Sequence, residues 1–578
     1  MRPVIDLSSL NKFIVNEHFQ MENLSCLKTL LLPGDFMTNI DLKDAYLSVP
    51  VHETSRKFLR FIWKGTCYQF KALPFGLCSA PRIFTKALKP VAAFLRRKAI
   101  RVLIYLDDFL LLAATVEEAV KNTQLVVSLL QSLGFTINLK KSLLTPTQAI
   151  TFLGFQIDST CMMLSLPAEK TDKILDCCHR LLVSQSITLR NLASLIGLLE
   201  SSRPAIWRAP LHFRHLQSDL IRGLQMNQES YDALIALSPS ARVELAWWLR
   251  HTLNANGSPV HLPPPDMIIT TDASKKGWGA VHQSFQTNGR WSQKESLQHI
   301  NYLELKASFL ALKTFLKDKS HVSVSLQLDN TTAIAYINNK GGTRSPQLMT
   351  LALEMWDWCQ ERDILLIASH IPGRDNVSAD KESREFTDMS EWKLDPIIIQ
   401  PFLLNCQTDL FASRLTSQLA AYISWRPDPG AIHTDAFTIN WATLRGYAFP
   451  PFNLISKTLT KVTIDQTELI LVAPVWQAQP WWPVLLRLLI SQPVLLPNSP
   501  TLLTDPTDLN RIHPMYPRLH LAVFHISTNV SKLRAFQQTL PTYSSQQLVP
   551  PHTKPTSLVG TVGAAGVLDG KLILFRHL

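Results

Sequence analysis

Two adjacent aspartates interrupt an otherwise apolar run, Val102–Ala113, which reads VLIYLDDFLLLA. Apolar stretches on both sides predict two buried strands joined by a tight turn at Asp107 and Asp108. A surface turn would favour Gly or Asn and more polar flanks. Because burying two like charges side by side is costly without a cation, the pair indicates a divalent metal. Mg²⁺ accepts such carboxylate ligands together with substrate phosphates.

A third acid is expected on a neighbouring strand. Asp41 lies in NIDLKDAYLSV, residues 39–49, whose alternating pattern predicts a strand leading into a turn. Three carboxylates on adjacent strands predict a two-metal site. Such a site activates a hydroxyl nucleophile and stabilises a pyrophosphate leaving group.

Four further acids stand on separate predicted elements in the middle of the chain. MIITTDASKKGWGAVH predicts strand, turn and strand, YLELKASFLALKTFL a helix, VSVSLQLDN a strand, and NVSADKESR a short helix. The acids are Asp272, Glu304, Asp329 and Asp380. The alternative for each acid taken singly is an exposed surface carboxylate, which is the usual location of Asp and Glu.

Composition narrows the class of protein. The 578 residues carry a formal charge of +12, with the excess of Lys and Arg concentrated in residues 1–157, and suit several domains. This basic segment fits a polyanion-binding surface, although a merely soluble basic domain remains open. Eight Cys residues without C-x-x-C argue against a disulfide scaffold. Without an apolar leader or a membrane-length run, we expect an intracellular protein of the cytoplasm or nucleus, with no membrane partner.

The chain divides into five expected segments and a multidomain fold of α+β and α/β type. Residues 1–157 and 266–385 mix strands with helices, whereas 158–265 is mostly helical and ends in a Pro-rich linker. Residues 386–500 are rich in Trp and Pro, and 501–578 are expected to form an irregular tail.

Five motifs in the first segment resemble the palm motifs of reverse transcriptases in order and spacing. They are IDLKDAYLSVP, LPFGLCSAPRIFTKAL, YLDDFLLL, LGFTINLKKS and FLGFQID. The resemblance implies a right-hand polymerase, with fingers and palm over 1–157 and a helical thumb and connection over 158–265. It also implies that Asp41, Asp107 and Asp108 are the catalytic metal ligands, joined by the carbonyl of Leu42.

The same resemblance implies a set of nucleotide contacts. Tyr46 would exclude the ribose 2′-hydroxyl, Phe75 and Gly76 would line the pocket formed by residues 73–81, and a lysine would lie near the triphosphate. That lysine is Lys140 or Lys141, and Arg2 resembles a fingers arginine. Because the chain starts just inside the family's first fingers motif, we expect truncated fingers and weakened nucleotide binding.

The second set of acids resembles that of a ribonuclease H fold, through TDAS, GWGA, LELKA and LDN. The resemblance implies that Asp272, Glu304, Asp329 and Asp380 hold two Mg²⁺ and cut the RNA of a hybrid. His370, in SHIPGRDN, either assists product release or is structural.

Residues 408–490 resemble a phage-type adenine methyltransferase of three-layer α/β design. YAFPPFNLI matches the family's active-site loop at Pro450, Pro451 and Phe452, but Phe449 replaces the polar residue that would bind the target amino group. A Gly-rich cofactor loop is absent from the sequence. The segment is therefore expected to be degenerate.

The order of segments most resembles the Pol of tyrosine-recombinase (DIRS) retrotransposons, with gypsy-type and pararetroviral polymerases as alternatives. We expect an enzyme that copies RNA into DNA and degrades the RNA of the hybrid, with two Mg²⁺ per site and Mn²⁺ as a substitute. Its partners would be an RNA template, a DNA primer, an RNA–DNA hybrid and dNTPs, while the oligomeric state stays open. The alternatives are a catalytically impaired nucleic-acid-binding relic and an active DNA adenine methyltransferase.

Overall fold

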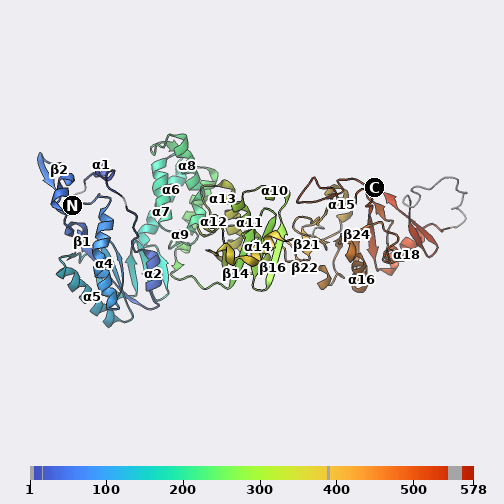
Figure 1. The fold of residues 1–578 in the computed structure, drawn as a ribbon, viewed down its shortest axis with the longest axis horizontal. Helices are drawn as coiled ribbons and strands as arrows, with labels where there is room; N and C mark the ends of the chain where they lie inside the picture. The colour runs from blue at the N-terminus through green and yellow to red at the C-terminus, as the bar shows by residue number, and fades with distance from the viewer. Residues whose placement is uncertain (1–4, 16, 387–390, 544–562) are drawn as a thin grey trace. The chain divides into compact units, whose positions relative to one another are not determined.

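The computed structural model describes residues 5–15, 17–386, 391–543 and 563–578, and the chain forms two compact units (Figure 1). The first unit is Met1–Pro263 and the second is Pro264–Leu578. This boundary falls within the Pro-rich linker that the sequence predicts. Of the helices in the described ranges, none combines the length and apolarity needed to cross a membrane.

A sheet with strand order β4-β5-β1-β6 forms the centre of the first unit, and β7 also pairs with β1. Its strands are β1 (Phe36–Lys43), β4 (Arg101–Tyr105), β5 (Asp108–Ala113), β6 (Thr136–Ile137) and β7 (Leu143–Thr147). The predicted hairpin over residues 102–113 is confirmed, with Tyr105 paired to Asp108. Both faces of this hairpin are buried, because Phe109 and Leu111 face one core and Leu110 and Leu112 the other. Double burial explains why the sequence is apolar rather than alternating.

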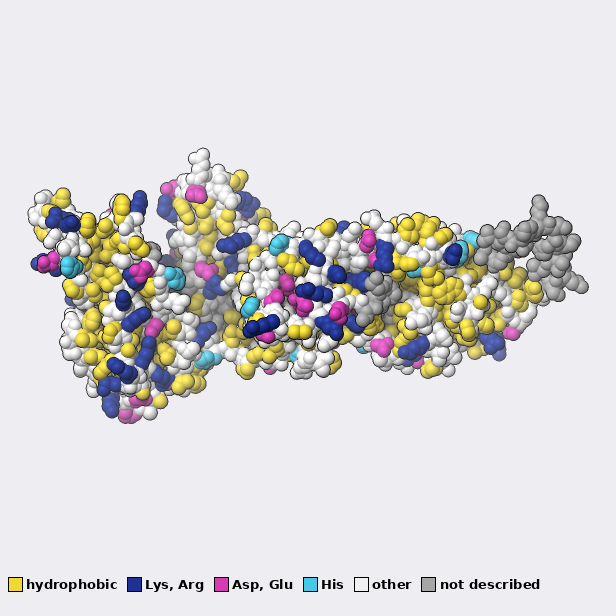
Figure 2. Space-filling view, viewed as in Figure 1, with side chains coloured by type: hydrophobic (Ala, Val, Ile, Leu, Met, Phe, Trp, Pro, Cys, Tyr) yellow, Lys and Arg dark blue, Asp and Glu magenta, His cyan; other side chains and the backbone are white. Residues whose placement is uncertain are grey.

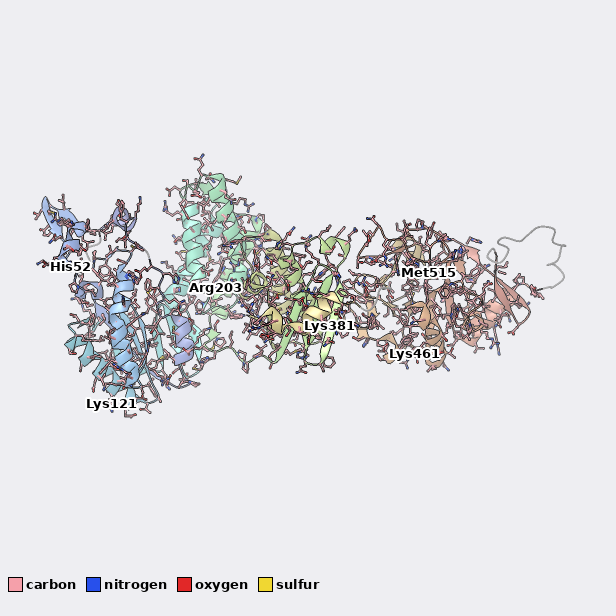
Figure 3. The ribbon with its side chains drawn as sticks, viewed as in Figure 1. His52, Lys121, Arg203, Lys381, Lys461 and Met515 are labelled. Atoms are coloured by element: carbon pink, nitrogen blue, oxygen red, sulfur yellow. The ribbon has the colours of Figure 1, made fainter. Side chains whose placement is uncertain are left out.

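Two long helices cover one face of this sheet. They are α4 (Ala80–Arg97) and α5 (Val116–Ser132), and Lys121 marks α5 in Figure 3. The remaining elements of this part are short: α1 (Ser8–Asn11), α2 (Leu24–Leu30), η1 (Ala45–Ser48), α3 (Glu53–Arg56), η2 (Lys57–Leu59), and the hairpin β2 (Arg60–Trp63) and β3 (Thr66–Gln69).

The other face of the sheet shares its core with a helical region. The connecting strands are β8 (Ala149–Phe152), β9 (Phe155–Asp158), β10 (Met163–Ser165) and β13 (Ser258–Pro259). The helices are α6 (Ala168–Val183), α7 (Leu189–Glu200), α8 (Arg214–Met226) and α9 (Pro239–Ala255), with η3 (Ala209–His212) and the short pair β11 (Ile187–Thr188) and β12 (Leu234–Ile235). Thr188 and Ser238 cap α7 and α9. The mostly helical segment expected from the sequence is thus present.

The second unit begins with a body that we call the central body, residues 264–386. Its sheet has the order β16-β15-β14-β17-β18, in which β14, β17 and β18 run parallel. The strands are β14 (Met267–Ala273), β15 (Gly277–His282), β16 (Phe285–Arg290), β17 (Ser323–Leu328) and β18 (Leu365–His370). The helices are α10 (Gln293–Ser296), α11 (Ile300–Phe315), α12 (Thr331–Asn338), α13 (Pro346–Glu361), η4 (Gly373–Asp375) and α14 (Val377–Arg384).

We call the rest of the second unit, residues 391–543 and 563–578, the C-terminal body. Its sheet has the order β22-β21-β20-β23-β24-β27-β25-β30. The strands are β20 (Thr408–Asp409), β21 (Ala421–Ser424), β22 (His433–Thr434), β23 (Gly446–Ala448), β24 (Glu468–Pro474), β25 (Val494–Leu495), β27 (Leu521–Ser527) and β30 (Arg576–His577). The first five are parallel, whereas β27 runs antiparallel between β24 and β25.

Helices and short elements surround this sheet. They are α15 (Pro396–Leu403), η5 (Ala436–Thr438), η6 (Phe452–Leu454), α16 (Ile455–Asp465), α17 (Trp482–Arg487), α18 (Val530–Thr539), the pair β19 (Lys393–Leu394) and β26 (Leu503–Thr504), and the pair β28 (Ala564–Leu568) and β29 (Lys571–Leu574). Phe524 faces one core and Val523 faces the other, so the sheet is the middle of three layers.

The expectation of an irregular tail from residue 501 is wrong for β27. This strand pairs along its full length with β24 and lies inside the sheet. Its sequence, LAVFHIS, is short and apolar, and Pro- and Thr-rich stretches flank it. Long-range pairing, which local composition does not reveal, therefore extends the domain beyond residue 500.

Candidate active sites

Asp41 and Asp108 lie opposite each other in the antiparallel pair of β1 and β5. The backbone N–H of Leu42 donates a 2.9 Å hydrogen bond to the carbonyl of Asp107, which fixes the turn against β1. Leu106 precedes that aspartate with φ +53, a left-handed conformation that is costly for a residue with a side chain. The hairpin thus presents Asp107 and Asp108 beside Asp41.

Two residues that the sequence argument missed hold Asp41 in place. The side-chain amide of Asn138 donates a 2.7 Å hydrogen bond to Oδ1 of Asp41, and its backbone N–H donates to the Asp41 carbonyl at 2.8 Å. The hydroxyl of Ser142 accepts the N–H of Asp41 at 2.9 Å. Leu42 is buried in the same strand and pairs with Ile137 of β6. The signal was available, because Asn138 and Ser142 are the uncharged polar residues of the INLKKS segment.

The negative charges of Asp107 and Asp41 act on Asp108. Burial raises the pKa of Asp108 to about 6, the charges of Asp107 and Asp41 add to this effect, and Lys141 opposes it. Of the two lysines considered from the sequence, Lys141 is therefore the one that acts on this carboxylate, although both are exposed. A bound cation would relieve the same repulsion.

Tyr46 lies next to these acids on η1. Its ring centroid is 5.2 Å from that of Phe75 and 5.5 Å from that of Phe84. Burial, followed by the charges of Asp107 and Tyr105, raises the pKa of its hydroxyl. The structure thus brings Tyr46 and Phe75 together beside the acids.

Gly76 takes a conformation that only glycine adopts without strain. Its φ is +95, and an added Cβ would stand 3.0 Å from the carbonyl oxygen of Ile5. Asn11 clamps this loop, because its side chain donates to the Gly76 carbonyl at 2.9 Å and accepts the N–H of Cys78 at 3.0 Å. Arg2, which the sequence assigns to nucleotide contact, lies outside the described residues.

A second acidic site lies in the central body. Asp272 is in β14, Glu304 is on α11, and Asp329 directly follows β17. Among the described residues these three form the single group of potential metal ligands whose donor atoms all lie within 4.8 Å of one another. The sheet brings these acids together because β14 and β17 are adjacent and parallel.

The chemistry of this triad fits a divalent cation. Burial raises the pKa of Glu304 to about 9, and Asp272 and Asp329 add to it. Burial also raises the pKa of Asp272 to about 6, although a hydrogen bond from Ser383 opposes the rise. The Oε2 atom of Glu304 is buried with no hydrogen-bond partner. Clustered carboxylates with an unsatisfied buried oxygen are a donor set for a hard cation.

The fourth predicted acid, Asp380, is outside this tight group. It lies on α14 and forms an ion pair with Arg384. Its charge still reaches Asp272, whose pKa it raises. The neighbouring Ser383 donates a 2.6 Å hydrogen bond to Oδ2 of Asp272 and was missed by the sequence argument.

His370 ends β18 and is exposed. It pairs in register with Leu328, the residue before Asp329, so it lies at the same end of the sheet as the triad. In the following loop, a Cβ added to Gly373 would stand 3.1 Å from Oδ2 of Asp329. A role in product release stays a prediction.

The loop after β23 in the C-terminal body is aromatic rather than polar. The Phe449 ring lies 6.3 Å from that of Phe452, which in turn lies 5.2 Å from Trp476. Phe449 packs against an apolar core cluster and offers no hydrogen-bond acceptor on its side chain.

Comparison with known proteins finds similarity over the residues that contain the first acidic site. The family model for "Reverse transcriptase (RNA-dependent DNA polymerase)" matches residues 1–157. The genome polyprotein of Petunia vein clearing virus is 23% identical over 410 residues, which cover 69% of this chain and 18% of the polyprotein. The enzymatic polyprotein of Cauliflower mosaic virus is 23% identical over 406 residues, covering 67% of this chain and 56% of the polyprotein. That of Figwort mosaic virus is 24% identical over 399 residues, with the same coverage of 67% and 56%.

Solved structures of a foamy viral protease-reverse transcriptase are also similar. The complex with an RNA/DNA hybrid has 20% identity and a TM-score of 0.41, covering 68% of this chain and 51% of that one. A complex with double-stranded DNA has 18% identity and a TM-score of 0.40, covering 63% and 62%. The chain spans between 18% and 56% of the length of the viral polyproteins named above. Residues 1–157 therefore match the reverse transcriptase family model, and about two thirds of the chain is similar to viral polyproteins.

Proposed function

We propose that this chain is an RNA-directed DNA polymerase with a fused ribonuclease H, and that it derives from a retroelement. The observation that carries the proposal is the placement of Asp41 opposite Asp108 at the end of a buried hairpin, inside a domain that matches reverse transcriptases. RNA template, DNA primer, RNA–DNA hybrid and dNTPs are the corresponding substrates. The relatives' coverage limits the comparison to about two thirds of this chain.

The residues of the first site have complementary roles in this proposal. Asp41, Asp107 and Asp108 would hold two Mg²⁺, or Mn²⁺ as a substitute, which activate the primer 3′-hydroxyl and stabilise the leaving pyrophosphate. Asn138 fixes the rotamer of Asp41. Tyr46 packs against Phe75, where its ring would exclude a ribose 2′-hydroxyl. Lys141 adds positive charge on the side of Asp108.

DNA synthesis on an RNA template with a DNA primer tests the polymerase. The double substitution Asp107→Asn with Asp108→Asn should lower dTTP incorporation by more than about a hundredfold. Glu117→Gln, an exposed acid on α5 of the same domain, is the matched control and should leave synthesis unchanged. If wild type makes no more product than the double variant, the chain is the nucleic-acid-binding relic and not a polymerase.

Ribonuclease H activity is supported by the triad of Asp272, Glu304 and Asp329, together with Asp380 nearby. Two Mg²⁺ at these acids would activate a water and stabilise the departing 3′-oxygen of the RNA. Asp329→Asn should abolish cleavage of a labelled hybrid and spare DNA synthesis. Asp318→Asn changes an exposed acid of the same body and serves as the control. Joint loss of cleavage and synthesis in Asp329→Asn would contradict two separate sites.

We further infer that the C-terminal body descends from a methyltransferase, which favours the tyrosine-recombinase order of retroelement over the gypsy type. The support is the match of Pro450, Pro451 and Phe452 to the family's active-site loop, which here lies on a doubly wound, mostly parallel sheet.

Methyltransferase activity itself does not fit the residues. Phe449 cannot accept the hydrogen bond of a target amino group. The sequence after β20 lacks a Gly-rich loop for the cofactor. Titration calorimetry with S-adenosylmethionine should therefore give no heat of binding, and measurable binding would revive the methyltransferase alternative.

A further inference from the structure

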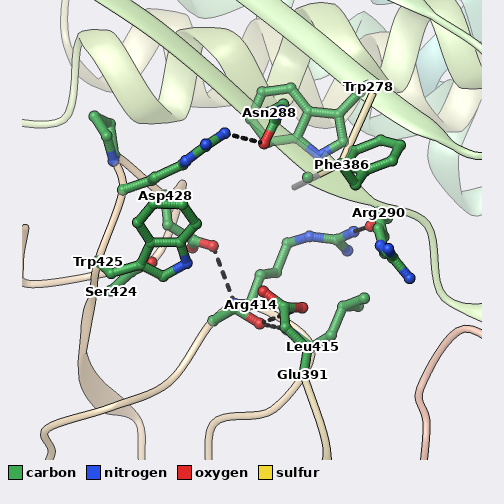
Figure 4. Close-up of a pocket in the computed structure, with 14 residues that line it drawn as sticks. Trp278, Asn288, Arg290, Phe386, Glu391, Arg414, Leu415, Ser424, Trp425 and Asp428 are labelled. Carbon is green, nitrogen blue, oxygen red and sulfur yellow. Dashed lines mark hydrogen bonds between the residues drawn. The ribbon is translucent and has the colours of Figure 1, made fainter. Parts of the chain in front are cut away.

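Arg414 of the C-terminal body binds the central body. It lies in the loop after β20 and donates to both carboxylate oxygens of Glu295 on α10, at 2.8 and 3.1 Å. It also donates to the carbonyl of Arg290 at 3.0 Å (Figure 4). The two side chains are only 22% and 19% exposed. Burial alone would raise the pKa of Glu295, but Arg414 holds it below its ordinary value. A bidentate, largely buried pair of this kind is geometrically specific.

Arg426, in the loop after β21, reaches a second point on the central body. It donates to Oδ1 of Asn288 on β16 at 3.1 Å and lies 3.8 Å from Oε2 of Glu382 on α14. The amide of Asn288 donates to that same oxygen of Glu382 at 2.7 Å. The guanidinium of Arg426 lies over the ring of Trp425, 4.2 Å from the ring centroid. One network thus joins the C-terminal body, the edge strand β16 and helix α14.

Further contacts extend this surface. The hydroxyl of Thr287 donates to the carbonyl of Pro427, the ammonium of Lys317 to the carbonyl of Ala431, and the N–H of Gln293 to the carbonyl of Pro506 at 3.0 Å. Figure 2 shows acidic side chains mixed with Lys and Arg side chains over this part of the second unit. The contact is therefore polar and distributed rather than a single ion pair.

Helix α14 lies between this contact and the triad, because Glu382 meets Arg426 and Ser383 binds Asp272. It carries Asp380 and Ser383, and Ser383 donates to Asp272. The helix packs so closely on β15 that a Cβ at Gly279 would stand 2.5 Å from the carbonyl of Ala379 and 2.6 Å from Cβ of Glu382. A shift of α14 would therefore change both the hydrogen bond to Asp272 and the position of Asp380. Lys381 marks the helix in Figure 3.

The position of the contact on the C-terminal sheet is unusual for such a fold. In open α/β sheets, ligands bind outside the carboxyl ends of the strands. Here the loops at the carboxyl ends of β20 and β21 contact the central body and leave a cavity of about 50 Å³. That volume has room for water but not for a nucleoside-sized ligand.

We propose that the C-terminal body is a scaffold for the acidic site of the central body. Through Arg414 and Arg426 it fixes β16 and α14, and it thereby positions Asp380 and Ser383 beside Asp272. Arg426 is a positioning residue, since it acts on the site through Glu382. The effect on cleavage rests on the proposed ribonuclease activity, whereas the effect on α14 does not.

Hydrogen–deuterium exchange in the full chain tests the structural part. Arg426→Ala should speed exchange of the amides of α14, residues 377–384, by roughly tenfold, and leave β24 unchanged. Lys532→Ala is the matched control, because it removes a cation of the same body that pairs internally with Glu468. Exchange of α14 that is the same in both variants would overturn the proposal.

Hybrid cleavage and DNA synthesis, measured on the same protein, test the functional part. Arg426→Ala should lower the kcat of cleavage roughly tenfold with little change in KM, while synthesis is unchanged and Arg426→Lys recovers part of the loss. A wild type that protects α14 yet cleaves no hybrid would refute the ribonuclease proposal and leave the scaffold intact.

Exchanging the charges of Arg414 and Glu295 distinguishes loss of this contact from misfolding of the variants. Arg414→Glu and Glu295→Arg should each speed α14 exchange, and the double variant should slow it again because the pair is restored with opposite polarity. A double variant whose α14 exchanges as fast as in either single variant would contradict the docking contact.

Discussion

The side-chain amide of Asn138 donates a 2.7 Å hydrogen bond to Oδ1 of Asp41, across the β1–β6 edge of the first candidate active site. A carboxylate that must hold a metal is useful only in one rotamer, and this bond selects it. We therefore expect Asn138→Ala to lower DNA synthesis by about 10- to 100-fold, mainly through a weaker apparent affinity for Mg²⁺. Primer extension at increasing Mg²⁺ measures both quantities.

The control for this substitution is Asn122→Ala on α5, a half-buried asparagine of the same domain. It should leave the Mg²⁺ dependence of primer extension unchanged. Equal activity of Asn138→Ala and wild type at low Mg²⁺ would show that Asp41 needs no such support.

Gly76→Ala should weaken nucleotide binding. Alanine at φ +95 costs about 1–2 kcal/mol in backbone strain, and its Cβ would press on the Ile5 carbonyl at 3.0 Å. We expect a roughly tenfold higher KM for dNTP and a smaller change in kcat. Gly65→Ala at the β2–β3 turn shares the strain, with φ +81, but meets nothing within 4 Å. If both variants raise KM equally, strain alone explains the effect and the loop has no special role.

The sequence singles out Asp108 and Asp329 because each stands where an apolar run meets a turn. Asp108 begins β5 and Asp329 follows β17, as the buried strands before and after them require. Polar partners on distant elements were harder to find. Asn138 reaches Asp41 over 97 positions and Ser383 reaches Asp272 over 111, and neither belongs to a periodic pattern. Such contacts depend on strand order and helix packing rather than on local propensity.

Dependence on strand order and helix packing also explains two further features that the sequence does not reveal. Strand β27 lies in a stretch of Pro and Thr and becomes a strand only by pairing with β24. The contact of Arg414 with Glu295 joins the loop after β20 to helix α10, 119 positions away, and neither segment carries a recognisable motif. Burial and long-range pairing decide both features, so a single sequence does not reveal them.

Gly279→Ala should disturb the second acidic site through sterics. Gly279 pairs with Asp272 in the β14–β15 ladder, and because it has no side chain, helix α14 packs directly against its backbone. An added methyl group should destabilise the second unit by about 1–3 kcal/mol and reduce hybrid cleavage. Gly197→Ala on α7 meets nothing within 4 Å and should instead stabilise its helix by about 0.5–1 kcal/mol. Thermal unfolding and hybrid cleavage by the two variants check these opposite signs, and a tolerated Gly279→Ala would contradict the close packing.

Glu244 should make the helical region of the first unit less stable as the pH rises. It is buried on α9, where its carboxylate accepts the backbone N–H groups of His215 and Leu216 at 2.9 Å each. Burial raises the pKa of Glu244 to about 7, and these N–H groups oppose the rise. Between the ordinary pKa of 4.5 and about 7, the folded state binds the proton that the unfolded state has lost. Its stabilising contribution is therefore complete below pH 4.5 and is lost as the pH rises through 7.

Glu244→Gln removes this titration while keeping the shape of the side chain. The opening free energy of wild type, relative to the variant, should fall by about 2–3 kcal/mol between pH 5 and pH 8. Hydrogen exchange of the α8 and α9 amides, corrected for the intrinsic pH dependence of exchange, measures this difference. The absolute stability of the variant is not the criterion, because Gln presents an NH₂ group to one of the two N–H donors. If the opening free energies of wild type and variant change with pH in the same way between about pH 5 and pH 8, the pKa of Glu244 is not raised.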